Sequence, residues 1–188
     1  MAHLILASSS PRRKELLLQM GLDFDIHSPD IDESVFEHEQ IEQYVLRLAK
    51  TKAQAVLGIY PQATVVAADI SLVFADQIIG KPESKQHAFE IWQLLSGQKH
   101  EVLTGVCVAN IHQLLSVVVR TEVEFQPLSL NDMEAYWATG EPLGKAGAYA
   151  IQGIAAKYVT SIHGSYSNVV GLPLHETMQL LDRIDQRS

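Results

Sequence analysis

The sequence predicts a mixed α/β fold with at least one pair of long antiparallel strands. Apolar, β-branched runs of strand length alternate with segments whose apolar residues recur at helical spacing. Two of the long strand-like runs, 100–111 and 114–126, are separated by only two residues, which is hairpin spacing. Hydrophobic residues make up 47% of the 188, so a sizeable core forms without disulfides or a structural metal.

Composition favours one domain over 1–188, or one domain with a small lobe, because no linker, repeat or low-complexity tract interrupts the chain. The single cysteine, Cys107, has no partner for an internal disulfide. No apolar run reaches the ~20 residues that span a bilayer, and the N-terminus lacks a basic signal region, so we expect a cytoplasmic protein without a membrane partner. The net charge of -8 argues against a nucleic acid polymer as partner.

Strands are expected where short apolar runs are bounded by turn residues. These runs are 4–7, 22–26, 64–74, 100–111, 114–126 and 158–162. Ala75, Asp76 and Gln77 form a predicted hairpin turn after the third run.

Helices are expected where apolar residues recur at helical spacing between capping residues. They cover 11–20, 39–60, 84–96, 129–139 and a final segment from 172. Ser10 and Pro11 are typical of a helix start, and Ser129 with Asp132 resembles a capping box. The glycine-rich segments 141–153 and 164–171 are predicted to be loops.

The first candidate site is the helix start that follows Ser8 and Ser9. Free backbone N–H groups and a partial positive charge gather at a helix N-terminus, where acidic residues are preferred. Arg12 and Arg13 lie in this first turn against that preference. The pattern indicates either a phosphate site or a capped helix with solvated arginines.

Asp69 is the second candidate, because it interrupts the otherwise apolar strand 64–74. A buried carboxylate needs a cation, a metal or hydrogen-bond donors, so Asp69 is either a structural ion pair or strand-edge cap, or a metal ligand or general base. Lys52 is the third candidate. It lies eleven residues after Ile41, within about 20° of it around the helix, and so on the inward stripe. Its ammonium either reaches the edge of the core or meets an internal anion.

Three further residues are weaker candidates on their own. Glu33, with Asp30 and Asp32, forms an acidic loop that fits either a solvated turn or Mg²⁺ bound through one carboxylate, water and phosphate oxygens. Lys81 follows the tight exit from the predicted hairpin. Gln152 ends a segment rich in small residues, and its amide suits a pyrimidine edge or a surface turn.

Together these motifs resemble the Maf (septum-formation-protein-like) family over nearly the whole chain. Each motif is weak alone, but their order and spacing are specific. The matching stretches are 6–13, 32–33, 49–53, 68–69, 80–82, 95–97, 145–149, 151–153 and 164–173.

The resemblance implies a fold related to the inosine-triphosphate pyrophosphatases (Maf/HAM1): a mixed, elongated, twisted sheet flanked by helices around a central cleft, often in a homodimer. It implies hydrolysis of a nucleoside triphosphate to the monophosphate and pyrophosphate, with Mg²⁺ or Mn²⁺. Asp69 would be the catalytic base. The phosphate and metal site would be completed by Arg12 or Arg13, Glu33, Lys52 and Lys81.

Branches of the family differ at the positions of Arg12, Ile70 and Gln152. Arg12 and Gln152 resemble the branch that acts on dTTP and UTP, whereas Ile70 stands where that branch usually has threonine. Strand alternation turns Ile70 away from the face shared by Asp69 and Ser71, so Ser71 is a poor substitute for that threonine. We therefore expect the chemistry to survive and the base selectivity to be open to change.

The predicted mechanism has cations neutralise the triphosphate, with help from Ser8, Ser9 and nearby backbone N–H groups, while Asp69 orients or deprotonates a water that attacks the α-phosphorus. Glu33, with Asp69, would hold the metal. Two alternatives stay open. One is a nucleotide-binding regulator of cell division without turnover. The other is a house-cleaning pyrophosphatase for modified purine nucleotides such as 7-methyl-GTP, whereas modified pyrimidine nucleotides would fit the dTTP/UTP function itself.

Overall fold

The computed structural model describes residues 3–186, in which seven strands form one mixed sheet. The strand order is β2-β1-β3-β5-β6-β7, and β4 pairs with β3. The described residues fall into two compact units. The first unit holds 3–70, 103–119 and 171–186, and the second holds 71–102 and 120–170. This result confirms the predicted mixed α/β class.

In the first unit, β1 (Leu4–Leu6) is parallel to both of its neighbours, β2 (Asp25–Ile26) and β3 (Thr64–Phe74). The long strands β5 (Lys99–Ala109) and β6 (Leu114–Phe125) follow in the sheet and contribute residues to both units. The turn at Asn110 is closed by its side-chain oxygen, which accepts from the backbone N–H groups of His112 and Gln113.

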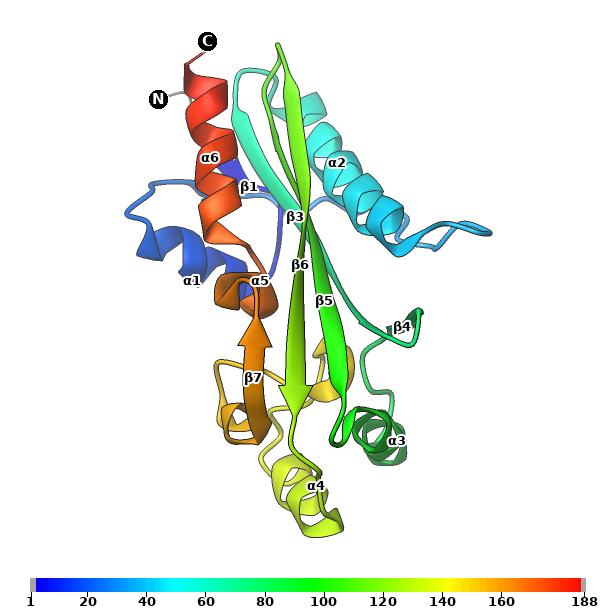
Figure 1. Ribbon diagram of the computed structural model, residues 1–188. Coiled ribbons are helices and arrows are strands. Elements are labelled where there is room, and N and C mark those ends of the chain that lie inside the picture. Colours follow the sequence, from blue (N-terminus) through cyan, green and yellow to red (C-terminus); the bar gives the residue numbers. More distant parts are fainter. Residues whose placement is uncertain (1–2, 187–188) are drawn as a thin grey trace. The chain divides into compact units, whose positions relative to one another are not determined.

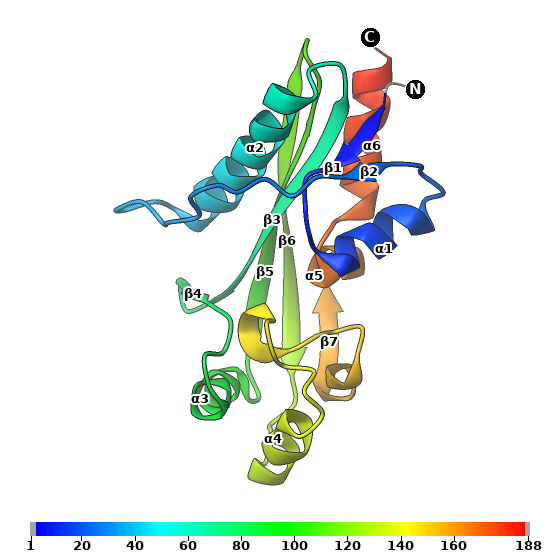
Figure 2. The same ribbon diagram turned by 180° about the vertical axis from the view of Figure 1, so that it is seen from behind.

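Helices cover both faces of the first unit's strands. One helix, α2 (Ile41–Ile59), packs its buried stripe against β1, β3 and β5, and Ala49, Ala53 and Val56 join a fully apolar core. The helices α1 (Pro11–Gln19) and α6 (Leu174–Asp185) lie on the opposite side of the strands from α2 (Figures 1 and 2). Burial of these apolar stripes supplies the main stabilisation of the unit.

The second unit packs its helices around aromatic side chains. Its elements are β4 (Gln77–Ile79), α3 (Lys85–Leu95), α4 (Leu130–Trp137), η1 (Ala146–Ala148), η2 (Ile154–Tyr158), β7 (Val159–His163) and α5 (Tyr166–Val170). Both β4 and β7 are antiparallel to their long neighbours, β3 and β6 respectively. The buried indole of Trp92 donates a 3.0 Å hydrogen bond to the carbonyl of Ala148, which ties α3 to η1.

Most local predictions are confirmed. The strand 64–74 has the predicted limits, and Ala75 and Asp76 take positive φ values of 49° and 60° in the turn after it. Such a pair of left-handed residues is typical of a two-residue hairpin turn. Both hydrogen bonds of the capping box of α4 are present, joining Ser129 and Asp132. Ser10 is the N-cap of α1, but its side chain makes no capping hydrogen bond.

The predicted loop 164–171 is wrong, because it contains the short helix α5. The hydroxyl of Ser165 accepts from the backbone N–H of Asn168, which starts the turn. The buried amide of Asn168 then donates to the carbonyl of Val102 and to the hydroxyl of Thr121. These partners lie 66 and 47 residues away, so local sequence carries no signal for them. Across residues 3–186, no helix combines the length and apolarity needed to cross a membrane.

Candidate active site

A lysine between two carboxylates is the centre of the candidate site. The ammonium Nζ of Lys52 on α2 lies 2.7 Å from Oδ1 of Asp69 on β3 and 2.7 Å from Oε1 of Glu33 in the loop before α2. The side chains of Lys52 and Asp69 are 11% and 12% exposed, whereas that of Glu33 is 56% exposed. The predicted inward orientation of Lys52 is therefore confirmed, and its partner is an internal anion.

Burial makes Asp69 a better proton acceptor than an ordinary aspartate. Loss of solvent raises the pKa of its carboxyl, and the charge and hydrogen bond of Lys52 offset part of that rise. The guanidinium of Arg13 lowers the pKa of Asp69 further, and the carboxylate of Glu33 raises it. Asp69 is thus a buried carboxylate that is paired with Lys52 and feels the charge of Arg13, so cations compensate its buried charge.

Arg13 reaches the site from the first turn of α1. Its Nε donates to the carbonyl of Gly171 at 2.9 Å, and its Nη1 donates to the hydroxyl of Ser8 at 3.2 Å. Burial lowers the pKa of Arg13, while the charges of Asp69 and Glu33 raise it and that of Arg12 lowers it. A buried guanidinium stays charged, because its ordinary pKa lies far above neutrality.

The segment between β1 and α1 forms the rest of this corner. Ser8 is buried, and its hydroxyl also accepts from the backbone N–H of Ser10 at 3.1 Å. Ser9 is exposed and Arg12 is half-buried, and burial lowers the pKa of Arg12. Two arginines at a helix start, with hydroxyls beside them, form a surface suited to an anion such as phosphate.

The two carboxylates fit a divalent cation. Asp69 and Glu33 each place one oxygen within hydrogen-bond distance of the same ammonium, so their charges already converge on one cation. Mg²⁺ binds through one or two carboxylates, with substrate phosphates and waters as its other ligands. No group of three or more His, Cys, Asp or Glu side chains that could hold a metal occurs among residues 3–186. Two carboxylates of this kind suit a metal that arrives with a phosphate substrate.

The structure brings five of the predicted site residues together: Ser8, Arg13, Glu33, Lys52 and Asp69. Arg12 acts on Arg13 through its charge and belongs to the same corner. Half-buried Ile70 follows Asp69 on β3, and its orientation toward the other face of the strand stays a prediction.

Lys81 and Gln152 belong to the second unit, and both are exposed. Lys81 follows Gly80, whose carbonyl accepts from the backbone N–H of Gly147. The roles of Lys81 and Gln152 stay predictions.

Sequence reasoning missed the groups that hold these side chains in place. The carbonyl of Gly171 accepts from Arg13 across 158 residues, and no local pattern signals it. The hydroxyl of Tyr44 donates to the carbonyl of Glu33 at 2.9 Å. Arg47, one turn later on α2, donates to the carbonyl of Ser34 at 2.8 Å. Tyr44 and Arg47 are three residues apart on α2, so they are neighbours on the surface of the helix that carries Lys52, and this spacing is the sequence signal for them.

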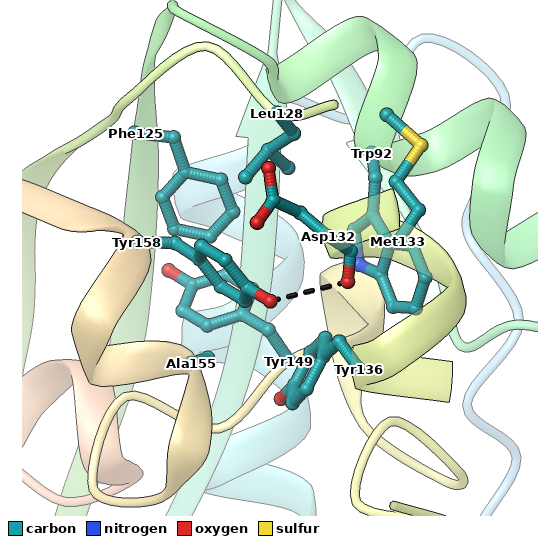
Figure 3. Close-up of a pocket in the computed structure, with 9 residues that line it drawn as sticks. All are labelled: Trp92, Phe125, Leu128, Asp132, Met133, Tyr136, Tyr149, Ala155 and Tyr158. Atoms are coloured by element: carbon teal, nitrogen blue, oxygen red, sulfur yellow. Dashed lines mark hydrogen bonds between the residues drawn. The ribbon is translucent and has the colours of Figure 1, made fainter. Parts of the chain in front are cut away.

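An aromatic pocket in the second unit is part of its core. Its lining residues are Trp92, Phe125, Leu128, Asp132, Met133, Tyr136, Tyr149, Ala155 and Tyr158 (Figure 3). The hydroxyl of Tyr158 donates to the backbone carbonyl of Asp132 at 3.1 Å. The free volume is about 10 Å³, which is close to the minimum for one water molecule and far too small for a nucleotide.

Comparisons with known proteins cover almost the whole chain. The family model described as Maf-like protein matches residues 3–184. A dTTP/UTP pyrophosphatase of Acinetobacter baylyi is 62% identical over 179 residues, which cover 95% of this chain and 98% of that protein. A protein of the same name from Salmonella typhimurium is 47% identical over 186 residues, covering 98% and 94%. A solved HAM1 protein from Coxiella burnetii, 14% identical, matches over 100% of both chains with a TM-score of 0.52, which shows a shared fold.

Proposed function

This chain belongs to the Maf family, and on that premise we propose that it is a nucleoside-triphosphate pyrophosphatase that hydrolyses dTTP and UTP to the monophosphate and pyrophosphate. The observation that carries the proposal is the ammonium of Lys52 at 2.7 Å from the carboxylates of both Asp69 and Glu33, with Arg13 beside them. A buried base next to several cations is the combination that water attack on a phosphate chain needs.

Binding of the triphosphate rests on positive charge gathered locally in a chain of net charge -8. Arg12, Arg13 and Lys52 neutralise phosphate oxygens in the first unit, and Ser8 and Ser9 line the same helix start. Lys81 of the second unit is proposed to add a further cation. Fixed cations stabilise the negative charge that builds on the bridging and equatorial oxygens as the phosphoanhydride breaks.

Asp69 is proposed to accept the proton of the attacking water. The water oxygen bonds to the α-phosphorus, the bond from that phosphorus to the bridging oxygen breaks, and pyrophosphate leaves with the bonding electrons. The proton passes to the carboxylate of Asp69, whose raised pKa suits this acceptance. The nearby ammonium of Lys52 keeps the carboxylate ionised before the reaction.

Glu33 and Asp69 are the residues proposed to hold Mg²⁺ or Mn²⁺. A bound divalent cation would neutralise phosphate charge and orient the leaving group. We expect a chelator to abolish pyrophosphate release and excess Mg²⁺ or Mn²⁺ to restore it. Glu33→Gln should raise the metal concentration that gives half-maximal rate. If Glu33→Gln reaches half its maximal rate at the same metal concentration as the wild type, Glu33 is not a metal ligand.

The central test is the Asp69→Asn variant, assayed by pyrophosphate release from dTTP and UTP. The amide keeps the size of the side chain but cannot accept the proton, so we expect kcat to fall about 10²–10⁴-fold. His112→Gln, which changes an exposed residue in the β5–β6 turn, is the control and should keep full activity. If Asp69→Asn keeps most of the wild-type kcat, Asp69 is not the base.

A panel of nucleotides distinguishes this function from its two rivals. A pyrimidine pyrophosphatase releases pyrophosphate from dTTP and UTP with a higher kcat/KM than from 7-methyl-GTP. A modified-purine enzyme reverses that order, and a regulator without turnover binds nucleotide but releases nothing. We propose that Gln152 and Arg12 set the preference, and that Ile70→Thr changes the ratio of kcat/KM between nucleotides more than it changes kcat for the best one.

The cytoplasmic location and the homodimer stay predictions.

A further inference from the structure

The loop that carries Glu33 has few apolar anchors of its own. Between β2 and α2, residues 27–40 form no regular element other than a turn, and Glu33, Val35 and Phe36 are all exposed. A segment that buries so little apolar surface gains little from the hydrophobic effect. Specific polar contacts must therefore hold the carboxylate of Glu33 at 2.7 Å from Lys52.

Arg47 makes most of these contacts. Its Nε and Nη2 donate to the two carboxylate oxygens of Glu39 at 2.6 and 2.7 Å, a bidentate pair in which the side chain of Glu39 is 7% exposed. The same Nη2 donates to the carbonyl of Ser34 at 2.8 Å. The guanidinium carbon also lies 3.8 Å from the centroid of the Phe36 ring. One side chain thus contacts the loop at 34, 36 and 39.

The loop is also closed on itself around these contacts. The second oxygen of Glu39 accepts from the backbone N–H of Phe36 at 3.1 Å. The carboxylate of Asp32 accepts from both the backbone N–H and the hydroxyl of Ser34. Tyr44 adds the contact to the carbonyl of Glu33. The backbone on both sides of Glu33 is therefore tied to α2 or to an adjacent turn.

Both ends of the Glu33–Lys52 pair consequently depend on one helix. Lys52 is part of α2, and Glu33 is held through Tyr44 and Arg47 of the same helix. A planar guanidinium serves this purpose because its donors point in fixed directions and its face stacks on an aromatic ring, neither of which an ammonium can reproduce.

We propose that Arg47 is a positioning residue of the pyrophosphatase site, which acts through Glu33 by holding the loop 33–39 against α2. The inference rests on the proposed function, since it assigns Arg47 a role in the same site. It goes beyond that function by naming a residue that touches neither Lys52 nor Asp69 in any described contact and yet sets the geometry around them.

A double-mutant cycle separates this role from a merely structural one. Arg47→Lys keeps the charge and loses the fork and the stacking, so we expect kcat/KM for dTTP to fall about tenfold. In a Glu33→Gln background the same change should have almost no further effect, because the carboxylate that Arg47 positions is gone. Losses that multiply in the double variant would overturn the proposal.

Two additional variants keep the outcome decisive. Glu39→Gln weakens the bidentate pair without changing Arg47, and we expect the same loss of kcat/KM from it. It therefore tests the proposal even if Arg47→Lys fails to fold. Arg120→Lys, which alters the exposed ion pair with Glu101 in the second unit, is the matched control and should leave kcat/KM unchanged.

The same cycle is also measured on the dissociation constant of a non-hydrolysable α,β-methylene analogue of dTTP by calorimetry. If the wild type binds the analogue but releases no pyrophosphate from any nucleotide, the proposed function fails, and the cycle on the dissociation constant still decides the role of Arg47. If the wild type turns over and Arg47→Lys and Glu39→Gln both match it, only the role of Arg47 fails.

Discussion

His100 is a buried histidine outside the candidate site, in the aromatic core of the second unit. It is 2% exposed, and its Nε2 lies 2.7 Å from the hydroxyl of Tyr149. Its ring packs edge-on against the rings of Phe125 and Tyr149, with centroids 5.0 and 5.5 Å away. Burial lowers the pKa of His100 to about 4 from its ordinary value of 6.5. Folding therefore favours the neutral imidazole.

This residue predicts a specific loss of stability in acid. Below pH 6.5 the unfolded chain takes up a proton on His100 that the folded chain excludes until pH is near 4. The free energy of unfolding should therefore decrease as the pH is lowered from 6.5 to about 4, by about 3 kcal/mol in total from this group. His100→Gln should flatten the pH dependence of urea unfolding over that range relative to wild type. Matching slopes in the two proteins would contradict the assignment.

The packing of α2 onto β5 depends on a glycine. A Cβ at Gly105 would overlap the backbone of Val45 and Leu46 in α2, so the helix approaches the strand closely only because position 105 has no side chain. This contact matters for the site, because α2 carries Lys52 together with Tyr44 and Arg47. A strand glycine that marks such a close approach is a packing requirement.

Two alanine substitutions should have opposite effects on stability. Gly105→Ala forces α2 away from β5, and we expect a loss of about 1–3 kcal/mol with reduced kcat/KM. Gly58→Ala changes an exposed glycine near the end of α2 with open space around it, and it should stabilise the protein by about 0.5–1 kcal/mol. Thermal unfolding and pyrophosphate release measure both effects. Equal Tm values for the two variants would make this account of Gly105 wrong.

At the scale of the whole molecule, three strands pass from one compact unit to the other. The boundaries fall between Ile70 and Ser71 in β3, between Val102 and Leu103 in β5, and between Val119 and Arg120 in β6. Because unfolding of either unit would remove part of each of these strands, we retain the prediction of a single domain over 1–188.

Calorimetry tests this prediction directly. A single domain should unfold in one thermal transition whose calorimetric and van't Hoff enthalpies agree. Two resolved transitions, or a van't Hoff enthalpy well below the calorimetric one, would mean that the units unfold independently.

Local sequence patterns predict the class of fold, most of the elements and the residue types of the site. The limits of β3, the caps of α4 and the inward orientation of Lys52 all follow from periodicity and capping, because backbone geometry repeats over a few residues and imprints a local pattern. Asp69 could be singled out because a carboxylate in an apolar strand violates that pattern.

Which of these groups meet depends on how the elements pack. Residues from distant parts of the chain come together in the ion pairs of Lys52 with Asp69 and Glu33. The same is true of the hydrogen bond from Arg13 to the carbonyl of Gly171, and of the contacts that hold α5. The anchoring of the Glu33 loop by Arg47 belongs to the same class, since it depends on how the loop folds back on α2. Local periodicity fixes which face a side chain takes, whereas its partner is fixed only when whole elements pack and bury their apolar faces.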